Sequence, residues 1–265
     1  MVSCAVLDTM GVMMMLNENS TMKLHSLRLH AMAEEFSRQS EDPTINALSF
    51  EERFSLIVDC EFTQKENNRL ARLIRNAGFS NPRACVEDID YAAGRKLDAA
   101  LIQKLASCEY ILSGYNVQIL GATGVGKTFF SSALGISACR KSISTRYCRL
   151  PDLLVELTLA KEDSKYPKAL WEYRKPKLLI IDDWLMFRAN DEEAHMMYDL
   201  IETRQNAGSV IVCSQFDSAG WHELIENAIA ADSICDRLAH NSYRLVISGE
   251  SMRKRLAPKD ILAEA

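Results

Sequence analysis

The chain reads Gly121-Ala122-Thr123-Gly124-Val125-Gly126-Lys127-Thr128 directly after a short apolar segment, residues 117–120. This stretch matches every fixed position of the pattern G-x-x-x-x-G-K-[ST], and a helix-compatible segment follows it. Glycines in such a loop let backbone N–H groups turn onto an anion, and the start of the helix adds a partial positive charge. Lys127 would reach the β- and γ-phosphates, and the Thr128 hydroxyl would ligate Mg²⁺. The eight residues therefore predict a phosphate-binding loop for a nucleoside triphosphate, ATP, between a strand and a helix.

A second apolar segment further along the chain ends in two carboxylates. Residues 178–181 are Leu-Leu-Ile-Ile, and Asp182 and Asp183 follow them. At a strand tip, Asp182 would support the metal ion and Asp183 would orient or deprotonate an attacking water. An acidic pair after an apolar segment is common, because aspartate also caps turns. Its position after a phosphate-binding loop in the same domain makes it the expected second half of a hydrolytic site.

The apolar segment 209–213 is followed by Ser214 and Gln215. If its strand lies between the strand before the loop and the strand of Asp182, a polar residue at its tip contacts the γ-phosphate or the water. Gln215 is the first candidate for this role and Ser214 the second. The alternative, an ordinary polar residue in a turn, stays open at this point.

The pattern of apolar residues divides the chain into three parts. Residues 1–20 are expected to be a disordered extension, and helical spacing of apolar residues predicts a small all-helical domain over 21–112. From 113 to 265 strands and helices alternate, which predicts an α/β domain with a parallel five-stranded sheet and the ligand at the carboxyl ends of its strands. The expected strands are 116–120, 144–150, 177–182, 209–215 and 243–248, and the expected helices are 127–140, 151–161, 191–206 and 221–239.

Composition limits the compartment and the partners. The chain has 265 residues, of which 48% are hydrophobic and 25% charged, as in a soluble globular protein. It contains neither an apolar stretch long enough to span a membrane nor a signal peptide with a basic start, so we expect a cytoplasmic protein without a membrane partner. The eight cysteines are scattered without any C-x-x-C pair, which disfavours zinc and disulfides.

A formal net charge of −5 argues against a uniformly basic nucleic-acid binder, yet local basic stripes exist. Lys65, Arg69 and Arg72 are spaced i, i+4, i+7 on one helix face, with Arg75 close to it. Such a stripe could follow a phosphate backbone without reading sequence. From the residues alone, a solvated helix face is the more common meaning of this pattern.

Taken together, these motifs resemble the IstB-type transposition helper ATPases of bacterial insertion sequences, relatives of the DnaC/DnaI helicase loaders within the AAA+ class. The resemblance covers nearly the whole chain from about residue 22 and rests on the loop 121–128, on 179–184, on Ser214-Gln215 with 221–223, on 236–241 and on 249–253. Two positions depart from the family pattern. Leu185 stands where relatives usually have glycine, and Asp183 stands where many AAA+ proteins have glutamate.

The resemblance implies an AAA+ core without the usual C-terminal helical lid, preceded by a small helical domain. It implies ATP-dependent assembly of several copies on duplex DNA and delivery of that DNA to the transposase of the same element. It also favours the Lys65–Arg75 stripe as a DNA contact. Arg237 is then a candidate arginine finger that reaches the γ-phosphate in a neighbouring subunit, although an Arg paired with a nearby acid is the alternative.

Other functions remain open from the sequence. A helicase loader of the same fold would prefer single-stranded DNA, and a P-loop kinase would need an acceptor pocket and would act as a monomer. A GTPase is disfavoured because the chain has no N-K-x-D motif and no D-x-x-G after the strand of Asp182. A binding protein that uses ATP only as a ligand would tolerate Asp183→Asn.

Overall fold

The computed structural model describes residues 17–91 and 97–252. The chain packs as two compact units, and the division falls between Ala71 and Arg72, inside helix α3 (Phe50–Ala77). The domain boundaries expected from the sequence stay predictions. Residues 17–20 of the expected disordered extension are helical, whereas the rest of that extension, 1–16, lies outside the described residues.

The first unit is built from helices. Helix α2 (His30–Glu41) and the 3-10 turn η1 (Pro43–Ala47) precede α3. The start of α3 has a capping box, because Ser49 Oγ accepts from the backbone of Glu52 and the Glu52 carboxylate accepts from the backbone of Ser49. Gln39 on α2 donates to the Arg53 carbonyl at 3.1 Å and so ties the two helices together.

The second unit contains one five-stranded sheet in which every strand is parallel to its neighbours. The strand order is β2-β3-β4-β1-β5, so β4 separates β1 from β3. All carboxyl ends of the strands therefore meet at one edge of the sheet, which is where open α/β sheets bind ligands. The strands are β1 (Asn116–Leu120), β2 (Thr145–Arg149), β3 (Leu178–Trp184), β4 (Ser209–Ser214) and β5 (Ser242–Val246).

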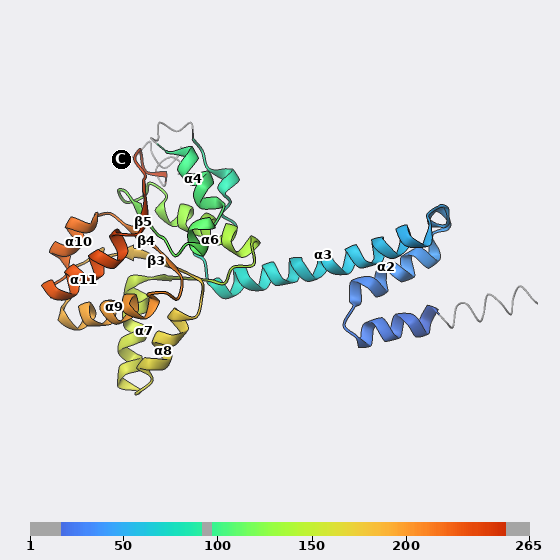
Figure 1. Ribbon diagram of the computed structural model, residues 1–265, viewed down its shortest axis with the longest axis horizontal. Helices are drawn as coiled ribbons and strands as arrows, with labels where there is room; N and C mark the ends of the chain where they lie inside the picture. Colours follow the sequence, from blue (N-terminus) through green and yellow to red (C-terminus); the bar gives the residue numbers. More distant parts are fainter. Residues whose placement is uncertain (1–16, 92–96, 253–265) are drawn as a thin grey trace, which may run out of the picture. The chain divides into compact units, whose positions relative to one another are not determined.

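Helices cover both faces of this sheet (Figure 1). Helix α6 (Lys127–Arg140) packs on one face, with α4 (Ala99–Ala106) behind it, whereas the core of the other face joins β3 and β4 to helices α7, α9 and α11. The remaining helices are α5 (Glu109–Leu112), α7 (Leu150–Glu162), α8 (Tyr166–Arg174), α9 (Asp191–Arg204), α10 (Ser218–Leu224) and α11 (Ala228–Ala239). Among the described residues, no helix is both long and apolar enough to cross a membrane.

The predicted α/β class and the parallel five-stranded sheet are confirmed, and the strands lie within two residues of their expected bounds. Two helical expectations differ from the structure. Helix α8 was not expected, and the single helix expected over 221–239 is broken into α10 and α11. The break arises because Asn227 caps α11 by accepting from the backbone of Ala230. The expected absence of a lid concerns mainly residues after 252, which lie outside the described residues.

A buried guanidinium fixes the amino edge of the sheet. Arg204, the last residue of α9, is 2% exposed and donates hydrogen bonds to five backbone carbonyls. Those carbonyls belong to the end of α8, to the connection from α8 to β3 and to the first residue of β4, namely Tyr173, Arg174, Pro176, Lys177 and Ser209. Burial lowers the pKa of Arg204 to about 10, so the group stays charged at neutral pH. The sequence gives no sign of this role, because each acceptor is a backbone atom.

We expect Arg204→Met to lower the free energy of unfolding by about 4 kcal/mol, because it strands buried carbonyls without donors. Urea denaturation followed by circular dichroism measures the effect. Arg188→Met, at an exposed position, is the control and should change stability little. Equal denaturation midpoints for the two variants would contradict the structural role assigned to Arg204.

Candidate nucleotide site

The predicted phosphate-binding loop lies at the carboxyl edge of the sheet, between β1 and α6. Gly121, Gly124 and Gly126 all have positive φ, at 156°, 84° and 104°. A Cβ on Gly121 would lie 2.3 Å from the Ile247 carbonyl oxygen, so this position needs glycine for space as well as for conformation. The loop is held from the far side by a hydrogen bond from the Met252 backbone N–H to the Gly124 carbonyl, at 2.9 Å.

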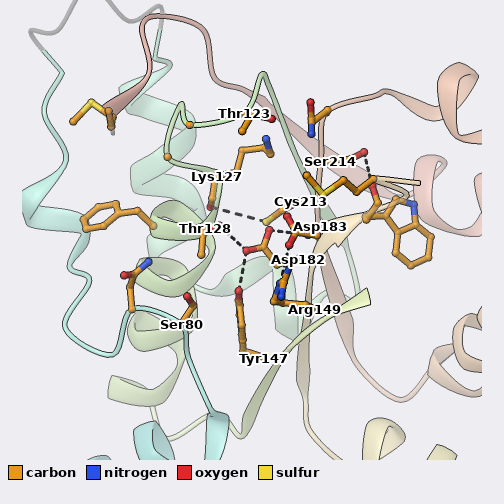
Figure 2. A pocket seen from close by; sticks show the side chains of 18 residues that line it. Ser80, Thr123, Lys127, Thr128, Tyr147, Arg149, Asp182, Asp183, Cys213 and Ser214 are labelled. Atoms are coloured by element: carbon orange, nitrogen blue, oxygen red, sulfur yellow. Dashed lines mark hydrogen bonds and ion pairs between the residues drawn. The ribbon is translucent and has the colours of Figure 1, made fainter. Parts of the chain in front are cut away.

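Lys127 and Thr128 point into the site that the loop encloses (Figure 2). The Lys127 Nζ donates to the carbonyls of Gly121 and Ala122, at 2.8 and 3.0 Å, so the ammonium lies along the inside of the loop. The Thr128 hydroxyl donates to Asp182 Oδ2 at 2.6 Å. The structure thus brings together the two motifs that the sequence predicted to cooperate.

Asp182 is the buried centre of the site, with 2% of its surface exposed. Its Oδ2 accepts from Thr128 and also from the Tyr147 hydroxyl, at 2.8 Å, and its Oδ1 accepts from the backbone of Asp183. A hydroxyl and a carboxylate are hard oxygen donors that suit Mg²⁺, which usually takes one or two protein ligands together with substrate phosphates and waters. No group of three or more metal-binding side chains occurs among the described residues, so the protein by itself offers only part of a metal shell.

A β-bulge sets the direction of the second carboxylate. Ile181 pairs with Val212 and Trp184 pairs with Ser214, so β3 has one extra residue between these pairs. Asp183 lies inside this irregularity with a left-handed φ of 53°. Bulges of this kind re-aim side chains next to active sites.

Asp183 is held by an arginine from the neighbouring strand. Arg149 Nε donates to Asp183 Oδ2 at 2.8 Å, and the same guanidinium lies 3.9 Å from Asp152. A carboxylate in this position can orient a water or accept its proton, but the ion pair with Arg149 occupies one of its oxygens. Neither Arg149 nor Tyr147 was singled out for this site from the sequence.

The predicted contact at the tip of β4 also lies at the site. Ser214 is buried, donates to the Trp184 carbonyl and accepts from Trp221 Nε1, both at 2.9 Å. Gln215 is exposed and lines the same cavity as Lys127. Because the hydrogen bonds of Ser214 are used within the fold, Gln215 remains the candidate for a contact with the γ-phosphate.

These side chains surround a cavity of about 770 Å³, a size suited to a small-molecule ligand. Its wall includes Ser80 and Asn81, from the segment that follows α3, and Phe129 and Met252. None of these four was predicted for the site. Only their proximity in space could have identified Ser80 and Asn81, because α3 ends at Ala77, far along the chain from the loop that begins at Gly121.

Arg237 lies away from this cavity. The Asn116 side chain, at the first residue of β1, donates to the Arg237 carbonyl, whereas the phosphate-binding loop follows the last residue of β1. Four strand steps, roughly 13 Å, separate these two ends. The guanidinium forms an ion pair with Glu202 and lies 5.2 Å from the ring centre of Tyr198. The structure therefore does not bring Arg237 to the nucleotide site of its own chain.

The predicted basic stripe lies on the exposed surface of α3. Lys65 and Arg69 are in unit one and have weak ion pairs on their own helix, with Glu61 at 3.4 Å and with Glu66 at 3.6 Å. Arg72 and Arg75 are exposed residues of the second unit.

The sheet order, the loop and the paired aspartates define a P-loop nucleotide-binding protein of the AAA+ class. Solved structures share this fold: DnaI has 19% identity and a TM-score of 0.54 over 63% of this chain and 92% of its own. The DnaC helicase loader has 17% identity and a TM-score of 0.52 over 62% of this chain and 97% of its own.

Within this class, residues 22–259 match the family model of the IstB-like ATP binding proteins, and the chain belongs to that family. An insertion-sequence ATP-binding protein of Sinorhizobium fredii, y4pL, is 37% identical over 88% of this chain and 94% of its own length. The ATP-binding protein of the insertion sequence IS1162 of Pseudomonas fluorescens is 38% identical over 77% and 89%. The resemblance found in the sequence is confirmed, and with it the binding of ATP.

We expect Arg149→Ala to raise the rate of ATP turnover severalfold, because it frees Asp183 to act on water. A coupled assay of phosphate release measures the rate. Asp152→Asn is the matched control: it removes the other acidic neighbour of Arg149 and leaves the pair with Asp183 in place, so the rate should not rise. A fall in the rate of Arg149→Ala would show instead that the guanidinium serves turnover directly.

Proposed function

We propose that this protein is an ATP hydrolase that assembles on duplex DNA and delivers this DNA to the transposase of its insertion sequence. The observation that carries the proposal is the contact between Thr128 and Asp182, with Asp183 beside it, in a family whose relatives are ATP-binding proteins of insertion sequences. A protein that binds a nucleotide without hydrolysing it would need no second carboxylate at the carboxyl edge of the sheet. Action on DNA would place the protein in the cytoplasm of its host.

Each residue of the site has a role in this proposal. Lys127 binds the β- and γ-phosphates, and Thr128 and Asp182 hold the metal ion. When bound, Mg²⁺ neutralises the charge that develops on the phosphates. Asp183 orients the attacking water and takes its proton, and Gln215 contacts the γ-phosphate from the tip of β4.

Assembly of several copies is supported by the position of Arg237. A guanidinium that stabilises the transition state must touch the γ-phosphate. Arg237 lies at the amino edge of the sheet, opposite to its own nucleotide, so it can play this part only toward the nucleotide of a second copy. ATP would then lie between subunits and favour their association.

Duplex DNA is supported by the exposed stripe of α3. Non-specific binding of DNA rests on contacts between cations and phosphates, and these contacts add up when copies are repeated along the duplex. Lys65, Arg69, Arg72 and Arg75 could therefore bind DNA in an assembly although the single chain has a net charge of −5. A helicase loader would instead prefer single strands, so a comparison of the two DNA forms separates these functions.

We expect ATP turnover per copy to rise with protein concentration and to rise further with duplex DNA, because the site is completed by a second copy. Phosphate release measured over a range of concentrations tests this. Turnover that is independent of concentration and of DNA would rule out assembly as the activating step.

Mixing of two inactive variants provides the sharper test. Arg237→Ala keeps its nucleotide site and lacks the finger, whereas Asp183→Asn keeps the finger and lacks the base. We expect the mixture to regain a measurable part of the activity, since one copy supplies what the other lacks. Arg244→Ala, another arginine paired with an acid, is the control and should stay active alone. A mixture no more active than the sum of its parts would contradict action in trans.

We expect replacement of Lys65, Arg69, Arg72 and Arg75 by glutamine to weaken binding to any duplex sequence and to flatten its dependence on salt. Fluorescence anisotropy at several salt concentrations measures both quantities. The control replaces Lys168, Arg174, Lys175 and Lys177, at and after α8, in the same way. An unchanged salt slope in the first variant would place the DNA contact elsewhere.

A further inference from the structure

The carboxylate of Asp182 receives a hydrogen bond from a side chain that has no part in the phosphate-binding loop. Tyr147, near the end of β2, donates its hydroxyl to Asp182 Oδ2 at 2.8 Å (Figure 2). The same oxygen accepts from the Thr128 hydroxyl. Burial and the charge of Asp182 both raise the pKa of Tyr147 well above its usual range.

Strand register explains why this contact forms. β2 and β3 are parallel neighbours, and Tyr147 pairs with Ile180 while Arg149 pairs with Asp182. Tyr147 and Arg149 share one face of β2 because side chains alternate along a strand. Each of them binds one of the two carboxylates at the end of β3.

The segment after α3 lines the same cavity as Tyr147. Gly78 ends the helix with a φ of 72°, and the buried Phe79 that follows packs against Gly135 of α6. Ser80 comes next and lines the nucleotide cavity together with Tyr147. The Tyr147 hydroxyl itself is fixed by its hydrogen bond to Asp182.

This arrangement limits how Asp182 can turn. The Asp183 backbone holds one carboxylate oxygen, and Tyr147 and Thr128 share the other. A metal ion held by Thr128 and Asp182 would find Oδ2 of Asp182 already kept in place by Tyr147. Partners of this kind orient the groups around a metal, and their loss costs affinity for the ion.

We propose that Tyr147 is a positioning residue for the metal site: its hydroxyl fixes Asp182 in the orientation in which it helps to hold the nucleotide-bound divalent cation. The inference rests on the proposed function, in which ATP is bound with Mg²⁺. It adds a role for the edge strand β2, which belongs to neither nucleotide motif.

The test compares binding of the nucleotide with binding of the metal. The probe is Mn²⁺, whose binding in the presence of a non-hydrolysed ATP analogue is followed by electron paramagnetic resonance. We expect Tyr147→Phe to weaken Mn²⁺ about tenfold. Affinity for a fluorescent ATP analogue in EDTA should stay unchanged, because the loop and Lys127 are untouched.

Tyr166→Phe is the matched control. Tyr166 donates to Asp199 at 2.8 Å, the same hydrogen bond as that of Tyr147, and neither Tyr166 nor Asp199 lines the nucleotide cavity. This variant should bind Mn²⁺ as the wild type does, and thermal unfolding should show whether the two variants are equally stable.

Three results would overturn the inference. One is wild-type affinity for Mn²⁺ in Tyr147→Phe. Another is a loss of nucleotide affinity in EDTA that equals the loss of Mn²⁺ affinity in Tyr147→Phe. This result would show that the tyrosine only supports the fold of the site. The third is a wild-type protein that binds the nucleotide and gains no Mn²⁺ site from it, which would also remove the metal from the proposed function. A wild-type protein that binds no nucleotide at all would contradict the proposed function at its base.

Discussion

The hydrogen bond between Thr128 and Asp182 links the start of α6, which follows β1, to the end of β3, and the site depends on it. β4 lies between β1 and β3, so the phosphate-binding loop and the paired aspartates face each other across its tip. The parallel arrangement makes this possible because all carboxyl ends lie at one edge. The bulge in β3 then turns Asp183 beside Asp182 rather than to the opposite face. The positions of the cavity, the loop and the two carboxylates thus follow from this one strand order.

Much of this could be predicted because the information is local. The loop glycines, Lys127 and Thr128 form a fixed pattern, and the alternation of strand-like and helix-like segments indicates the five strands. Contacts that depend on the register between two strands have no comparable pattern in the sequence. Residues 145–149 read as a mixed polar segment, and only the pairing of β2 with β3 shows that Tyr147 and Arg149 meet the two aspartates. Helix α8 was missed for a related reason, since its buried residues, Leu170 and Tyr173, pack against a core that the sequence does not display.

Cations on α3 and cations around the sheet differ in their partners. Around the sheet, many cations already have an acidic or carbonyl partner: Arg204 binds five carbonyls, and Arg140, Arg146 and Lys161 pair with glutamates. Pairs at the surface contribute little to stability, yet they leave fewer cations open to a phosphate group. On α3, Lys65, Arg69, Arg72 and Arg75 are exposed, and the ion pairs of Lys65 and Arg69 are long. This contrast supports the proposal that α3 contacts DNA although the chain is acidic.

The ion pair of Arg237 with Glu202 has a further consequence, for discrimination between anions. An open guanidinium attracts any phosphate group. With the carboxylate of Glu202 in contact, a ligand must displace a competing anion before it can use Arg237. In the proposed assembly, a triphosphate held in a fixed geometry by a second copy would offer several phosphate oxygens to the guanidinium at once, whereas a single phosphate group would offer fewer. Glu202 would thus disfavour contacts of Arg237 with other anions and keep its guanidinium available for the triphosphate of a second copy.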